Sequence, residues 1–123
     1  MEKNLKILFL YPNLNMSTLV PNAISILSAV LKAGGFKNID LFDTTFYGSK
    51  EDSKDENRVK TGQVQPFSFN EKGIKLKQSD MFQDFVKKIE QFNPDVIYAS
   101  IVEDTFPIFK KFMELIESRK ITV

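Results

Sequence analysis

The near-continuous apolar run at residues 5–11, "LKILFLY", constrains the fold more than any other feature of the sequence. Such a run is typical of a central strand in a parallel sheet, because helices cover both of its faces. Residues 21–36 then carry apolar side chains at helical spacing, and Gly34 and Gly35 predict the end of that helix. Residues 38–46, "NIDLFDTTF", predict a second strand. Together these segments predict a βαβ unit with a right-handed crossover.

The second half of the sequence repeats this alternation. Ser79 or Asp80 predicts the cap of a helix that residues 93–95, "NPD", bring to an end. One face of this helix is apolar, with Phe82, Phe85, Val86, Ile89 and Phe92. A third strand at 96–102, a third amphipathic helix from Phe106 and a strand stub at 121–123 follow. The stub either closes a small four-stranded sheet or begins the rest of a longer doubly wound sheet, and we favour the second.

The segment at about 48–66 differs in character from the rest of the sequence. It is charged, polar and poor in aliphatic residues, so it predicts a flexible excursion from a single domain that spans residues 1–123. The excursion is either a functional loop or a disordered connector, and its composition favours the connector. Phe67 and Phe69 predict that its far end packs against the body of the domain.

Composition excludes several kinds of function. The sequence has no cysteine and no histidine, which excludes disulfides, thiolate or imidazole metal sites and Ser-His-Asp catalysis. Seventeen Lys and Arg residues against 16 Asp and Glu residues leave a charge of +1, so no nucleic-acid partner is expected. The N-terminus reads as a strand rather than a signal peptide, and no apolar run reaches membrane-spanning length. We therefore expect a cytoplasmic protein with no membrane partner.

Two loops follow the expected strands at the edge where open parallel sheets bind ligands. The loop at 12–21 has no glycine-rich phosphate motif, but the hydroxyls of Ser17 and Thr18 remain candidates for binding a phosphate. Capping of the following helix by Ser17, Thr18 or Asn22 is the favoured alternative.

The second loop, at 100–107, carries the adjacent carboxylates of Glu103 and Asp104. Such a pair suits a magnesium ion or acid–base chemistry. An alternative at least as good is that Asp104 or Thr105 caps the next helix. These residues therefore give no firm catalytic or metal site.

Three segments, taken in order, resemble a known family: "KILFLYPN", "VPNAISILSAVLKAGGFKNIDLFDTTF" and "NPDVIYASIVEDTFPIFKKFMELIESRKITV". They are similar to the cobalamin-binding domain at the N-terminus of cobalamin-dependent radical S-adenosylmethionine enzymes. The resemblance implies a three-layer α/β fold with a doubly wound, flavodoxin-like (Rossmann-like) parallel sheet of strand order 2-1-3-4. It covers most of the chain outside residues 48–80.

The resemblance also implies a function, which is to bind cobalamin and present it to a downstream radical domain for methyl transfer. The D-x-H-x-x-G motif of other cobalamin domains is absent, so no protein histidine is expected on the cobalt. The C-x-x-x-C-x-x-C motif is absent too, so S-adenosylmethionine and an iron–sulfur cluster would belong to the downstream domain only. This chain alone is then expected to carry no catalytic residue.

The resemblance assigns the expected cofactor-binding residues to the two loops. In the first loop the residues expected to line the corrin are Pro12, Asn13, Leu14, Asn15, Ser17 and Thr18. In the second, Ser100 is expected to bond the base of the cofactor tail, followed by Ile101 and Val102, with the cleft edge at Glu103, Asp104, Thr105 and Phe106. A dimer through an exposed sheet edge is a further expectation. The alternative function is a cofactor-free interaction or regulatory domain that shares the fold.

Overall fold

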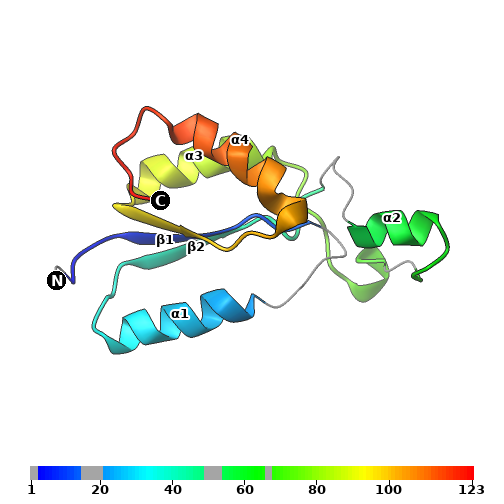
Figure 1. The fold of residues 1–123 in the computed structure, drawn as a ribbon, viewed down its shortest axis with the longest axis horizontal. Coiled ribbons are helices and arrows are strands. Elements are labelled where there is room, and N and C mark those ends of the chain that lie inside the picture. Colours follow the sequence, from blue (N-terminus) through cyan, green and yellow to red (C-terminus); the bar gives the residue numbers. More distant parts are fainter. Residues whose placement is uncertain (1–2, 15–20, 49–53, 66–67) are drawn as a thin grey trace.

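A three-stranded parallel sheet forms the centre of the fold (Figure 1). The structure is a computed structural model, and it describes residues 3–14, 21–48, 54–65 and 68–123. The strands are β1 (Ile7–Tyr11), β2 (Ile39–Asp43) and β3 (Val96–Ala99), in the order β2-β1-β3. The predicted α/β class, the parallel sheet and the central place of the first strand are confirmed.

Helices cover the sheet on both faces, which gives three layers (Figure 1). Helix α1 (Asn22–Ala33) lies on one face, and α3 (Met81–Phe92) and α4 (Phe106–Ile116) lie on the other. The short helix α2 (Lys54–Lys60) lies to one side of these layers.

The larger core lies between the sheet and helices α3 and α4. Three phenylalanine rings join the layers there, with ring centroids 4.6 Å apart for Phe85 and Phe112 and 5.3 Å apart for Phe42 and Phe85. The buried residues of this core are Leu8, Leu10, Leu14, Phe42, Tyr47, Phe85, Ile89, Ile97, Ile108, Phe112 and Ile116. Burial of so many large side chains supplies most of the driving force for folding.

The core on the α1 face is smaller because one helix covers it. Its buried residues are Ile7, Phe9, Tyr11, Ile24 and Phe36. The register pairs Phe9 with Leu41 of β2 and Tyr98 of β3, which places these three side chains on one face. Phe9 is buried, whereas Leu41 and Tyr98 are 39% and 47% exposed. Helix α1 therefore covers the middle of this face and leaves its two flanks open.

The ends of the helices test the predicted caps. Asp80 caps α3 as predicted, and its carboxylate accepts hydrogen bonds from the backbone N–H groups of Phe82 and Gln83. Asn93, in the left-handed conformation, ends the same helix. Asn22 does not cap α1: it is the first residue of the helix, and Pro21 holds the cap position without a side-chain bond. The proline thus sets the start of α1 through its fixed φ.

The segment predicted as a flexible excursion contains the short helix α2 among its described residues. Its sequence, "KDENRVK", is polar but contains residues with good helix propensity, and the polar composition masked this signal. Phe69 is buried against Phe46, with ring centroids 6.1 Å apart, so the predicted packing of the far end is confirmed at this residue. Phe67 lies outside the described residues.

Residues 121–123 run beside β3 without forming a full strand in the structure. Thr122 makes a single parallel bridge with Val96, and the Ile97 N–H donates to the Thr122 carbonyl at 2.8 Å. The third predicted strand is also shorter than expected, because regular pairing stops at Ala99.

Candidate functional site

The strand order creates one topological switch point, between β1 and β3. The chain passes from β1 to β2 on one side and then crosses to β3 on the other, so the two following loops diverge there. The Ser100 N–H donates to the Leu10 carbonyl at 3.0 Å, which holds the exit of β3 beside the end of β1. The structure thus brings residues 12–14 and 100–106 to the same edge of the sheet.

The residues after β1 are packed into the protein at this edge. Pro12, Asn13 and Leu14 are all buried, and Leu14 belongs to the core beneath α3 and α4. Three other predicted site residues of this loop, Asn15, Ser17 and Thr18, lie outside the described residues. A ligand-binding role for the first loop stays a prediction.

A buried polar network connects the ends of β1 and β2. The Asn13 N–H donates to Thr44 Oγ1 at 2.7 Å, and that hydroxyl donates back to the Asn13 carbonyl at 2.8 Å. The Asn13 side-chain amide donates to Thr45 Oγ1 at 3.0 Å, and the Thr45 hydroxyl donates to Asp43 Oδ1 at 2.6 Å. Because buried polar groups need partners, this network fixes the backbone at Asn13, directly after β1.

Sequence reasoning did not select Asp43, Thr44 and Thr45. The signal for them was the polar run "DTT" directly after the second strand, at the same edge as the two selected loops. Asp43 also affects the pKa of Tyr11, which is its partner in the register of β1 and β2. Burial raises the pKa of the Tyr11 hydroxyl, and the negative charge of Asp43 raises it further, so Tyr11 remains a neutral phenol.

The loop after β3 presents apolar side chains to the surface. Ile101, Val102 and Phe106 are 38%, 66% and 49% exposed, whereas Ser100 is half-buried. A 3₁₀ turn at Glu103–Thr105 joins this loop to α4. The switch point therefore offers exposed apolar side chains beside the carboxylates of Glu103 and Asp104, which would repel a phosphate. This surface suits a large, mainly apolar ligand better than a phosphate.

The predicted cap of α4 is not formed by a side chain. Thr105 holds the cap position, but its hydroxyl turns back to the loop, where it accepts from the Val102 N–H at 3.0 Å and donates to the Val102 carbonyl at 3.2 Å. Thr105 is buried, so these bonds fix the loop after β3. Among the residues that the structure describes, Glu103 and Asp104 join no group of three or more metal-ligating side chains.

Comparisons with protein-family models, with curated proteins and with solved structures found no match for this chain. In the described part of the chain, none of the helices has both the length and the apolar character needed to cross a membrane.

Proposed function

We propose that this chain is a cobalamin-binding module whose ligand lies at the switch point between β1 and β3. The observation that carries the proposal is the exposure of Ile101, Val102 and Phe106 at the edge where parallel sheets bind ligands. Exposed apolar side chains at such an edge suit a flat, mostly apolar ring such as a corrin. The order of motifs in the sequence supports the same ligand.

The residues present fit the cofactor in chemistry. Ile101, Val102 and Phe106 would contact the corrin, and the half-buried Ser100 would bond the polar tail. The buried network around Asn13 would hold the start of the opposite loop in place beside the ligand. Cobalamin would supply a cobalt-bound methyl group for transfer by a downstream radical domain. With no histidine in the chain, no protein imidazole would bind the cobalt.

We also infer that residues 121–123 begin a fourth strand beside β3, which gives the order 2-1-3-4. Two hydrogen bonds support this inference, from the Ile97 N–H to the Thr122 carbonyl and from the Thr122 N–H to the Asp95 carbonyl at 3.1 Å. They follow the pattern in which parallel strands alternate donor and acceptor along the ladder.

Equilibrium binding of hydroxocobalamin tests the proposed function. The purified chain is titrated with the cofactor, and binding is followed by absorption and by gel filtration. We expect the chain to retain the red cofactor and Phe106→Ser to weaken binding at least fivefold. Leu115→Ser is the matched control, because Leu115 is a similarly exposed apolar residue at the other end of α4.

Equal binding by the Phe106 and Leu115 variants would contradict the assignment of the site. No retention of cobalamin by the wild-type chain would contradict the function itself and favour the cofactor-free interaction domain. The outer face of α1 supports that alternative, because Ile26, Leu27 and Val30 are at least half exposed there.

A further inference from the structure

A pocket of about 480 Å³ lies between the outer edge of β2 and helix α3, away from the switch point. Three consecutive strand residues, Leu41, Phe42 and Asp43, line one side of it. The α3 side is formed by Asp84, Lys87, Lys88 and Gln91, and the end by Phe46, Tyr47 and Lys77. Consecutive strand residues point to opposite faces of a sheet, so a pocket that touches all three runs along the edge of the strand.

The backbone of β2 presents hydrogen-bonding groups to this pocket. The Asn38 carbonyl accepts a hydrogen bond from β1, and the Thr44 N–H donates one to β1. The backbone groups of the even-numbered residues between them therefore face β1, and those of the odd-numbered residues face outward. In the described sheet, β2 is the terminal strand. An edge strand of this kind is a template for pairing with another extended segment.

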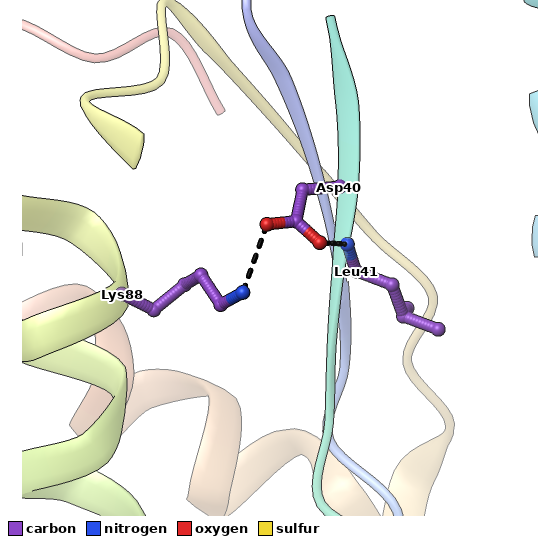
Figure 2. A network of polar contacts seen from close by, with 3 residues as sticks. All are labelled: Asp40, Leu41 and Lys88. Atoms are coloured by element: carbon purple, nitrogen blue, oxygen red, sulfur yellow. Dashed lines mark hydrogen bonds and ion pairs between the residues drawn. The ribbon is translucent and has the colours of Figure 1, made fainter. Parts of the chain in front are cut away.

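Asp40 already occupies one position that an added strand would use (Figure 2). Its Oδ1 accepts a hydrogen bond of 2.8 Å from the Leu41 N–H, which points outward from the edge. Its Oδ2 forms an ion pair of 2.8 Å with Lys88 Nζ on α3. The Asp40 carboxylate thus stands where the backbone carbonyl of a neighbouring strand would accept the same hydrogen.

Three lysines and two aspartates are the charged residues that line the pocket. Lys77, Lys87 and Lys88 line it, and Lys88 is the one that Asp40 holds. Asp84 is engaged by chain donors, since the Tyr47 hydroxyl and the Ser79 hydroxyl both donate to its Oδ2, at 2.9 and 2.6 Å. Asp43 likewise accepts from the Thr45 N–H and hydroxyl. Bonds from these neutral donors leave both aspartates charged, so the lysines exceed them by one, and Lys88 already binds a carboxylate, that of Asp40.

We propose that the groove between β2 and α3 binds an extended acidic peptide, which adds to the sheet as a strand beside β2. The Asp40 carboxylate competes with the peptide for both contacts. A backbone carbonyl of the peptide would take its place on the Leu41 N–H, and a side-chain carboxylate of the peptide would take its place on Lys88. The backbone bonds supply affinity and the lysines supply the preference for acidic side chains. This site is independent of cobalamin binding.

The test uses the full chain labelled with ¹⁵N and the peptide acetyl-Val-Glu-Val-Glu-Val-amide as the probe. We expect chemical-shift changes at the amides of residues 39–43 and 84–91, and weaker binding of the same peptide with lysine in place of glutamate. Asp40→Ala removes the competitor, so its affinity for the acidic peptide should rise at least threefold.

Glu90→Ala is the matched control for charge, because it also removes a carboxylate paired with a cation, here Arg119 at 3.3 Å. Its affinity should stay within twofold of the wild type. Lys87→Gln tests the charge preference in a variant that leaves Asp40 in place, and it should weaken binding about threefold. Equal effects of Asp40→Ala and Glu90→Ala, shifts confined to other parts of the chain, or no shifts in either protein would overturn the proposal.

Discussion

Thr44→Val tests whether the polar network at the sheet edge is structural. Valine has nearly the shape of threonine but lacks the hydroxyl, so the variant loses the bond from the Asn13 N–H and the bond to the Asn13 carbonyl. Thr44 and Asn13 are 2% and 4% exposed, so water does not readily replace these bonds. Two net hydrogen bonds and the desolvated Asn13 groups together predict a loss of about 2–3 kcal/mol in the free energy of unfolding.

Urea unfolding followed by far-ultraviolet circular dichroism measures this loss, since the chain has no tryptophan for fluorescence. A domain of this size has a stability of about 5–15 kcal/mol, so the folded variant remains measurable. Thr122→Val, at an exposed threonine, is the control and should change stability by less than about 0.5 kcal/mol. A loss below about 0.5 kcal/mol for Thr44→Val would refute the structural role of the network.

Two further substitutions test the packing and the electrostatics of the α3 side. Phe85→Ala removes a fully buried ring that contacts Phe42 and Phe112. It should lower the free energy of unfolding in urea by about 3–5 kcal/mol, and a loss below about 1.5 kcal/mol would contradict the assigned core. The pKa of Tyr47 is raised to about 12, first by burial and then by the hydrogen bond to Asp84 and the negative charge of Asp84. The folded state therefore holds the phenol proton more tightly than the unfolded state. The resulting stability is complete below pH 10 and is lost as the pH rises toward 12. Wild type should therefore lose about 1 kcal/mol more than Tyr47→Phe between pH 9 and 11, and parallel pH profiles would contradict this.

The strands and helices could be predicted because their signals are local. The apolar run at 5–11, the helical spacing at 21–36 and the capping residue Asp80 each depend on neighbours within a few positions. The start of α1 was predicted less well, because polar residues near Pro21 offered several caps and the proline alone sets the boundary.

Of the candidate site, only the place in the fold could be predicted from the sequence. The expected strand ends placed the loops at 12–21 and 100–107 at one edge, and the structure brings residues 12–14 and 100–106 together there. The hydrogen bonds from Asn13 to Thr44 and Thr45 join residues more than 30 positions apart, and no sequence pattern specifies such pairs.

The groove beside β2 could not be predicted from the sequence either. The ion pair between Asp40 and Lys88 spans 48 positions, and either residue alone reads as ordinary surface charge. The dimer expected through an exposed sheet edge did not single out β2, and the position of Asp40 on the Leu41 N–H emerges only from the folded backbone.

The most direct test of the central claim is to map hydroxocobalamin onto the ¹⁵N-labelled chain by its amide chemical shifts. The account predicts that the largest changes fall on residues 98–106 and on Asn13 and Leu14, on both sides of the switch point. Changes confined to α1, α2 or the groove beside β2, or no changes at saturating cofactor, would contradict it.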